Sequence, residues 1–295
     1  MAATIISGRE VSAEIREELK ARARALKERG IVPGLGVILV GEDPASVSYV
    51  AGKAKAAEEI GFSGRTFNLP ATASEEDILR VIDGLNRDEH THGVLVQLPL
   101  PKHVSADKVI NSILPAKDVD GLHPANVGRL LRGEPCPLPC TPYGVVQLLA
   151  RAGHSPEGKH VVVCGRSNLV GKPLAALLIQ KKKGANATVT VCHTGTPDLR
   201  KFTLLADILV AAMGSPRVIT ADMIREGCVV IDVGVNRVTD PAVPKGYRLV
   251  GDCDFEGMKE KAAAITPVPG GVGPMTVTML MMNTIEAAER KAGVA

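Results

Sequence analysis

The feature that most constrains the fold is a regular alternation of short apolar runs with longer segments of helical periodicity. Gly34–Val40 is an uninterrupted apolar run, and segments 93–100 and 160–165 resemble it in length and valine content. Strands that alternate with helices predict a parallel, doubly wound α/β sheet. We expect further strands at residues 65–69, 188–193, 207–212 and 228–234, and helices at residues 11–26, 46–60, 74–86, 145–152, 171–182 and 276–292.

The chain of 295 residues exceeds the usual size of one domain. Residues 99–142 are rich in proline and glycine, with one short helical piece expected at residues 107–113. This irregular stretch predicts a boundary between two α/β domains, one formed by residues 1–144 with 275–295 and one by residues 145–274. We expect the second domain to be of the Rossmann type, the closing helix to pack on the first, and the active-site cleft to lie between them.

Charge and cysteine usage narrow the class of partner. Lys and Arg number 35 against 32 Asp and Glu, and they are scattered, which predicts no nucleic-acid or membrane surface and favours small-molecule ligands. No run approaches the roughly 18 apolar residues of a membrane span, so we expect a soluble, cytoplasmic protein. Six cysteines suggest buried, reduced thiols. A zinc site from Cys136, Cys140, Cys192 and His193 lacks the usual tight paired spacing.

A glycine turn marks a candidate dinucleotide site. The segment from Gly165 to Gly171 directly follows an apolar strand and opens a helix, the context in which backbone N–H groups face a phosphate. Ser167 replaces the second glycine of the usual motif, which leaves a plain tight turn as the alternative. The next strand ends in Cys192-His193-Thr194 without an acid, while Arg166 supplies positive charge. This pattern favours NADP over NAD, unless Arg166 is merely exposed beside the turn.

Lys53 is the candidate for proton transfer. At helical periodicity it shares the apolar side of its helix with Ala57 and Ile60, and Tyr49 lies one turn away. A lysine taken out of water has a lowered pKa, which suits proton transfer near neutral pH. The alternative is a lysine that snorkels from the edge of a domain.

Other polar and constrained segments could complete a site. Gln97 stands at the end of an apolar strand, where a ligand contact or an ordinary cap would both fit. Asp120 follows in the motif of residues 117–121, and with Asp118 it gives only weak support for a metal. Residues 265–276 hold three prolines and three glycines before a helix. Such a rigid chain permits a cis proline and a flat ligand near the backbone, or simply connects two domains.

Six short motifs follow one another along the chain. They are Ser46-x-x-Tyr49-x-x-x-Lys53 and the segments 93–101 (GVLVQLPLP), 117–121 (KDVDG), 165–171 (GRSNLVG), 232–236 (DVGVN) and 266–274 (TPVPGGVGP). In this order they closely resemble the bifunctional methylenetetrahydrofolate dehydrogenase/methenyltetrahydrofolate cyclohydrolase family, over nearly the whole chain. The resemblance implies oxidation of 5,10-methylenetetrahydrofolate with NADP in preference to NAD, and hydrolysis of the product to 10-formyltetrahydrofolate. It also implies a homodimer in one-carbon metabolism, connected with purine biosynthesis.

The resemblance implies roles for individual residues. Lys53 would be the catalytic lysine, with Tyr49, Gln97 and Asp120 as its companions. The folate site would be lined by Tyr49, Lys53, Val96, Gln97, Leu98, Asp120, Pro269, Gly270 and Gly273, and the dinucleotide site by Gly165, Arg166, Ser167, Thr194 and Val235. Two rivals remain at this point: another NAD(P)-dependent dehydrogenase of a small substrate, and a nucleotide-binding module without turnover.

Overall fold

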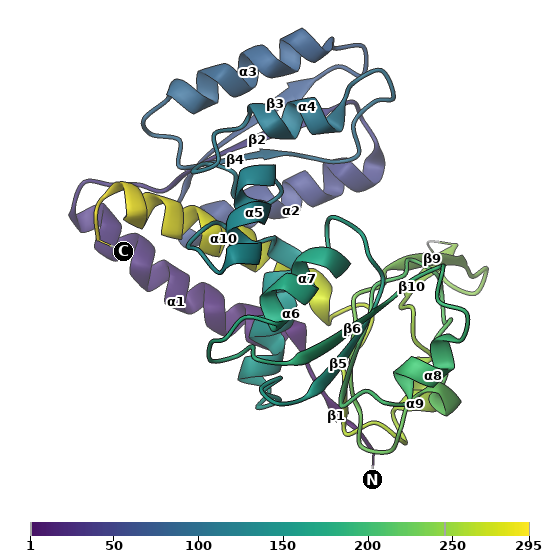
Figure 1. Cartoon of the computed structure of the whole chain (residues 1–295). Helices are drawn as coiled ribbons and strands as arrows, with labels where there is room; N and C mark the ends of the chain where they lie inside the picture. Colours follow the sequence, from purple (N-terminus) through teal and green to yellow (C-terminus); the bar gives the residue numbers. More distant parts are fainter. Residues whose placement is uncertain (1, 245, 295) are drawn as a thin grey trace. The chain divides into compact units, whose positions relative to one another are not determined.

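The computed structural model describes residues 2–244 and 246–294, which fold into two compact α/β units (Figure 1). The dinucleotide unit comprises Met1–Ser12 and Thr141–Thr276, and the lysine unit comprises Ala13–Cys140 and Val277–Ala295. Each unit has its own parallel sheet, which confirms the predicted fold class. Among the described helices, none is long and apolar enough to cross a membrane.

The lysine unit has a three-stranded sheet in the order β3 (Ser63–Leu69), β2 (Gly34–Val40) and β4 (Gly93–Val96). Strand β2 pairs in parallel with both neighbours. Helices α3 (Glu75–Arg87) and α4 (Ala106–Ser112) cover one face, and α2 (Pro44–Ile60) lies on the other (Figure 1). Isoleucine and valine side chains of α3, α4, β2 and β4 form the buried core beneath α3 and α4. The chain passes from β3 across β2 to β4, so the carboxyl ends of β2 and β4 form a topological switch point.

Local sequence explains most helix boundaries in this unit. Ser74 and Asp77 form the predicted capping box at the start of α3. Helix α2 begins at Pro44 because Asp43 accepts the backbone N–H of Ser46, and it ends at Ile60 because the next residue, Gly61, adopts the left-handed conformation. Helices α1 (Gly8–Glu28) and α10 (Val272–Lys291) are long and lie close to their predicted places; α1 is amphipathic, whereas α10 is buried along most of its length.

Two predictions for the stretch 93–142 were wrong. Strand β4 ends at Val96 instead of residue 100, because Pro99 and Pro101 follow and proline has no N–H to donate to a neighbouring strand. Helix α5 (Pro124–Arg132) occupies a segment expected to be irregular. Its N-cap is His123, whose ring accepts the Ala125 N–H, and histidine is not among the usual capping residues.

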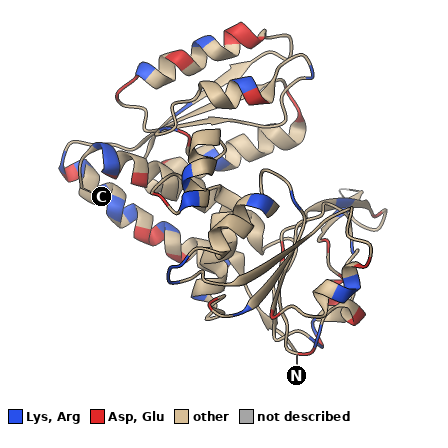
Figure 2. Ribbon diagram, viewed as in Figure 1, with Lys and Arg blue, Asp and Glu red and all other residues tan. Residues whose placement is uncertain are grey.

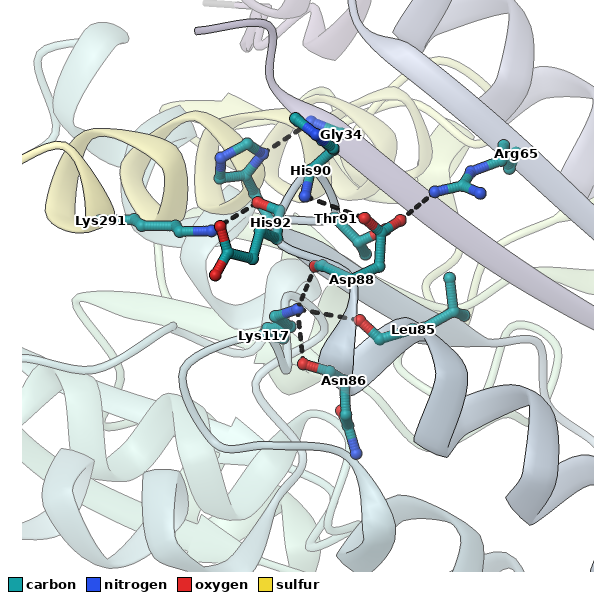
Figure 3. A network of polar contacts seen from close by, with 11 residues as sticks. Gly34, Arg65, Leu85, Asn86, Asp88, His90, Thr91, His92, Lys117 and Lys291 are labelled. Carbon is teal, nitrogen blue, oxygen red and sulfur yellow. Dashed lines mark hydrogen bonds and ion pairs between the residues drawn. The ribbon is translucent and has the colours of Figure 1, made fainter.

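A polar network fixes the chain where α3 ends and β4 begins (Figure 3). The Lys117 ammonium donates to the carbonyl oxygens of Leu85, Asn86 and Asp88 at 2.8, 2.8 and 2.7 Å. The Asp88 carboxylate pairs with Arg65, and the buried His92 ring accepts the Gly34 N–H at 3.0 Å. Lys117 therefore completes the carboxyl end of helix α3, where a cation is electrostatically favoured.

The dinucleotide unit has a six-stranded parallel sheet. The strand order is β1 (Thr4–Ile5), β11 (Ala264–Ile265), β8 (Val229–Asp232), β7 (Ile208–Ala211), β5 (His160–Cys164) and β6 (Thr188–Cys192). Helices α6 (Cys140–Arg151) and α7 (Gly171–Leu178) lie on one face, while α8 (Leu199–Thr203) and α9 (Phe255–Met258) lie on the other (Figure 1). Helices on both faces confirm a doubly wound sheet, whose switch point lies between β5 and β7.

The N-terminus departs from the predicted domain boundary. Strand β1 pairs with β11, so residues 1–12 belong to the dinucleotide unit, although they were assigned to the first domain. A strand of two residues is too short to leave a periodic signal in the sequence. The unit also has an antiparallel hairpin of β9 (Asn236–Thr239) and β10 (Tyr247–Val250), which was not predicted. The remaining boundaries of the second domain, at residues 141 and 276, are close to those expected.

The positions of the charged residues and of the cysteines agree with the predictions from the sequence. Lysine and arginine alternate with acidic residues along the ribbons of each unit (Figure 2). All six cysteines are free and buried, as predicted.

Candidate active site and dinucleotide pocket

Lys53 lies on α2 between the buried and the exposed sides of that helix. The buried residues of α2 include Val50, Ala57 and Ile60, so the predicted apolar side exists. Lys53 itself is half-buried, and Tyr49, one turn earlier, is 54% exposed. The lysine stem therefore has apolar neighbours on its own helix, while the Tyr49 ring is accessible to a ligand.

Gln97 holds the Lys53 ammonium. The Lys53 Nζ donates to Gln97 Oε1 at 2.9 Å, and Gln97 Nε2 donates to the Leu98 carbonyl at 2.6 Å. The backbone N–H of Gln97 donates to the Ile38 carbonyl of β2. Gln97 thus stands at the carboxyl edge of the sheet, at the switch point where ligands bind in open α/β folds.

Asp120 is the electrostatic partner of Lys53. Burial lowers the pKa of Lys53, and the Asp120 carboxylate offsets part of this effect by raising it. Burial likewise raises the pKa of Asp120, against the opposing influence of Lys53. Both groups are therefore moved toward their neutral forms, which suits a proton acceptor and donor near neutral pH.

The neighbours of Asp120 in its motif are structural. Asp118 is buried and accepts the N–H groups of Leu122 and His123, together with the side-chain amide of Asn126. Lys117 is committed to the end of α3. These hydrogen bonds account for Asp118 and Lys117 without a bound metal ion.

Cys140 and Asn283 support the Asp120 segment, and sequence reasoning did not assign either residue to the site. The Cys140 thiol donates to the Val119 carbonyl at 3.3 Å, and burial beside Asp120 raises its pKa. Asn283 of α10 donates to the carbonyls of Val119 and Leu138 at 2.8 and 2.7 Å. A buried asparagine inside the periodic pattern of a long helix was the available signal.

The other predicted folate contacts lie in different environments. Val96 is 5% exposed and packs in the core of the lysine unit, which leaves its backbone as the group that could face a ligand. Leu98 is half-buried next to Gln97. The predicted cis proline is confirmed at Val268–Pro269. Pro269, Gly270 and Gly273 belong to the dinucleotide unit, so their role with Lys53 stays a prediction.

The two glycines of the turn have no room for a side chain. Gly165 has φ 134°, and a Cβ there would lie 2.1 Å from the Ala212 carbonyl oxygen. A Cβ on Gly171 would lie 2.0 Å from the Gly165 carbonyl oxygen. Only glycine allows this close approach of β5, the turn and α7 at the switch point.

A pocket of about 410 Å³ opens at this turn. Its lining includes the predicted residues Gly165, Arg166, Ser167 and Thr194. Sequence reasoning missed its other wall, Ala212, Met213 and Ser215 after β7, together with Thr196 and Leu199. These residues follow a different strand and become neighbours only through the order of the sheet.

The rim of the pocket carries hydroxyl and basic groups. His193 accepts the Gly195 N–H on Nδ1 at 3.0 Å, which in a neutral ring places the proton on Nε2. Arg166 and Thr194 are exposed at the same rim. Val235 is 49% exposed in the turn after β8, an apolar surface that a flat ring could cover. The turn, the pocket and these groups fit a phosphorylated dinucleotide.

A Rossmann-type unit with this pocket, and a second α/β unit with a lysine–carboxylate pair, define a dinucleotide-dependent α/β enzyme. Residues 6–120 match the family model described as "Tetrahydrofolate dehydrogenase/cyclohydrolase, catalytic domain", and residues 139–292 match that of the NAD(P)-binding domain. The chain belongs to the tetrahydrofolate dehydrogenase/cyclohydrolase family, which confirms the resemblance.

Similar proteins agree over the full length. Bifunctional protein FolD of Dehalococcoides mccartyi (strain CBDB1) is 58% identical over 295 residues, 99% of both chains. The FolD protein of Syntrophus aciditrophicus is 57% identical, over 99% of this chain and 100% of that relative. The crystal structure of FolD from Campylobacter jejuni has a TM-score of 0.92 at 46% identity, covering 98% of this chain and all of that one. A Trypanosoma brucei FolD structure, complexed with NADP cofactor and inhibitor, has a TM-score of 0.93 at 42% identity, with 99% of each chain covered.

Proposed function

We propose that this chain oxidises 5,10-methylenetetrahydrofolate to the 5,10-methenyl form with NADP, and hydrolyses that product to 10-formyltetrahydrofolate. The observation that carries the proposal is the Lys53 amine, held by Gln97 at 2.9 Å and lowered in pKa by burial. The chain also belongs to the tetrahydrofolate dehydrogenase/cyclohydrolase family, whose name covers both activities. Lys53, Tyr49, Gln97 and Asp120 are the proposed catalytic set.

The dehydrogenase step mainly requires positioning. NADP supplies the hydride acceptor, and the folate methylene carbon becomes a methenyl carbon within a cation. The chain contributes the glycine turn for the phosphates, the pocket of 410 Å³ and an accessible Tyr49 against the folate. Two flat ligands held face to face lose much of their entropic barrier before the reaction.

The cyclohydrolase step requires proton transfers. As water attacks the methenyl carbon, neutral Lys53 accepts the proton that is released. The carbon–N5 bond then breaks, Lys53 returns its proton to N5, and the hydroxyl proton of the adduct leaves to solvent as the formyl group forms. Gln97 keeps the amine in place because it accepts a Lys53 N–H and leaves the nitrogen lone pair for the water.

Preference for NADP follows from the rim of the pocket. Strand β6 ends without an acid that would repel a 2′-phosphate, and Arg166, Thr194 and His193 offer donors. The NADP in the Trypanosoma brucei relative supports the same choice. The family resemblance further supports a homodimer in the cytoplasm that supplies one-carbon units for purine biosynthesis.

One assay tests the proposal. Purified protein is mixed with 5,10-methylenetetrahydrofolate and NADP or NAD, and the reduced dinucleotide and the folate products are measured. We expect reduced NADP together with 10-formyltetrahydrofolate. Reduction of the dinucleotide without a methenyl or formyl product, or no reduction with either dinucleotide, would contradict it. Light scattering after gel filtration tests the homodimer.

Replacement of Arg166 tests cofactor preference. Arg166→Gln removes a cation from the rim, so we expect the KM for NADP to rise about tenfold, the equivalent of one strong charge-assisted hydrogen bond. The KM for NAD serves as the internal control and should change by less than about twofold. An equal rise for both dinucleotides would place Arg166 away from the 2′-phosphate.

Replacement of Asp120 tests the folate site. Asp120→Ala removes the carboxylate next to Lys53, and we expect the folate KM to rise about tenfold or more through the loss of a buried partner. Dinucleotide binding should be retained. Asp107→Ala, an exposed acid in the first turn of α4, is the control. An unchanged folate KM and kcat would remove Asp120 from the site.

A further inference from the structure

Two buried carboxylates stand behind the dinucleotide pocket. Asp232 ends strand β8 and is 3% exposed, while Asp252 follows strand β10 and is fully buried. Asp232 accepts the backbone N–H groups of Gly234, Asp252 and Cys253 at 2.9 to 3.0 Å. Burial raises the pKa of Asp232 to about 6, partly opposed by these hydrogen bonds. Burying a charged group is energetically costly. Two carboxylates in this position therefore point to a role in holding the groups that they bind.

Asp252 binds the loop that forms the missed wall of the pocket. Its Oδ2 accepts the backbone N–H groups of Met213 and Gly214 at 2.5 and 2.9 Å. Its Oδ1 accepts the N–H of Ser215 at 3.0 Å and the side-chain amide of Asn236 at 2.9 Å. Three consecutive N–H groups, one residue beyond the end of strand β7, therefore converge on one side chain. Met213 and Ser215 line the pocket itself.

Two glycines next to these carboxylates have no room for a side chain. A Cβ on Gly234 would lie 2.2 Å from Asp252 Oδ1, and a Cβ on Gly251 would lie 1.8 Å from Asp232 Oδ2. The backbone N–H of Asp252 is itself held by Asp232 at 3.0 Å. Asp232 thus fixes Asp252, and Asp252 fixes the loop, in a chain of direct hydrogen bonds.

We propose that Asp252 is a positioning residue for the dinucleotide, which holds residues 213–215 in the conformation that forms the pocket wall. This inference rests on the proposed function, because it takes the pocket to be the NADP site. It also gives the motif of residues 232–236 a physical meaning, since Asp232 and Asn236 are both hydrogen-bond partners of Asp252 or its backbone.

The chemistry requires a carboxylate at this position. An ionised Asp has two oxygens that only accept hydrogen bonds, and here they face four N–H donors. An asparagine of the same shape would turn one amide N–H₂ group toward these donors. At least one loop N–H would lose its partner, and a buried donor without a partner destabilises the conformation that needs it.

The experiment measures NADP binding by titration calorimetry on the full chain. Calorimetry is suited to this chain because it has no tryptophan to report binding. We expect Asp252→Asn to raise the Kd for NADP about tenfold or more, and Asn236→Ala, which removes one donor of four, to raise it about threefold. Gly234→Ala should act like Asp252→Asn because it displaces the carboxylate. Asp254→Asn, the same change two residues away, is the matched control.

A second measurement separates positioning from general damage. Cyclohydrolase activity on the methenyl substrate, assayed without dinucleotide, reports the fold and the lysine unit. We expect it to fall by less than about twofold in Asp252→Asn, whereas the KM for NADP rises with the Kd. An unchanged Kd, or a loss of both activities in parallel, would overturn the inference while the proposed function stands. A wild-type chain that binds neither NADP nor NAD would overturn the proposed function and this inference together.

Discussion

Lys53→Met is expected to lower the cyclohydrolase kcat by a factor on the order of 10²–10⁴, the usual contribution of a positioned acid–base group. Methionine keeps the apolar stem that packs along α2, but it can neither accept nor return a proton. The dehydrogenase step requires no proton transfer by Lys53. The substitution should therefore lower the dehydrogenase rate much less than the cyclohydrolase rate. Rates of formyl and methenyl formation from the same preparation measure this separation.

Lys55→Met is the matched control, because Lys55 is exposed on the same helix. It should leave both activities within about twofold of the wild-type chain. The pH dependence gives an independent readout. Since burial lowers the pKa of Lys53, the wild-type cyclohydrolase rate should rise with pH and reach its plateau below the ordinary lysine pKa of 10.5. Full cyclohydrolase activity in Lys53→Met would remove this lysine from the mechanism.

Periodic signals in the sequence predicted most of the fold. Apolar runs predicted β2 with the bounds that the structure shows, and β5 to within one residue. The reason is that buried parallel strands are continuously apolar. The capping box located α3. The signals failed where elements are short or capped by unusual residues, as in β1, the β9–β10 hairpin and α5. The N-terminal boundary was missed for the same reason, since β1 is a strand of only two residues.

The sequence predicted site residues when their environment was local. Lys53 was recognised because a cation on the apolar side of a helix breaks that helix's own pattern. Gly165 and Gly171 were recognised because a glycine turn follows a strand. Asp252 has no such local signal, and the helical pattern that marks Asn283 does not show what it binds, because the partners come from distant segments: Met213 for Asp252, and Val119 for Asn283. Only the strand order and the return of α10 bring these groups together.

Lys117→Met is expected to lower the free energy of unfolding by about 3 kcal/mol or more, because hydrogen bonds to charged groups contribute roughly 1.5–3 kcal/mol each. The Lys117 ammonium serves three carbonyl oxygens at 2.7 to 2.8 Å, all at or just beyond the carboxyl end of α3 (Figure 3). Methionine would remove this donor from all three carbonyls, and the Asp88 carbonyl would keep only the Thr91 N–H. Denaturant-induced unfolding, followed by circular dichroism, measures the change.

The effect should also reach the active site. The carbonyl of Lys117 accepts the Val94 N–H at the start of β4, and Asp120 lies three residues further along. Loosening of this segment should therefore raise the folate KM in addition to lowering stability. Lys102→Met provides the control, because Lys102 is an exposed lysine of the preceding loop. A loss of stability no larger than that of the control would show that the three carbonyls are satisfied equally well by water. Lys117 would then contribute to the motif for another reason, such as direct contact with the substrate.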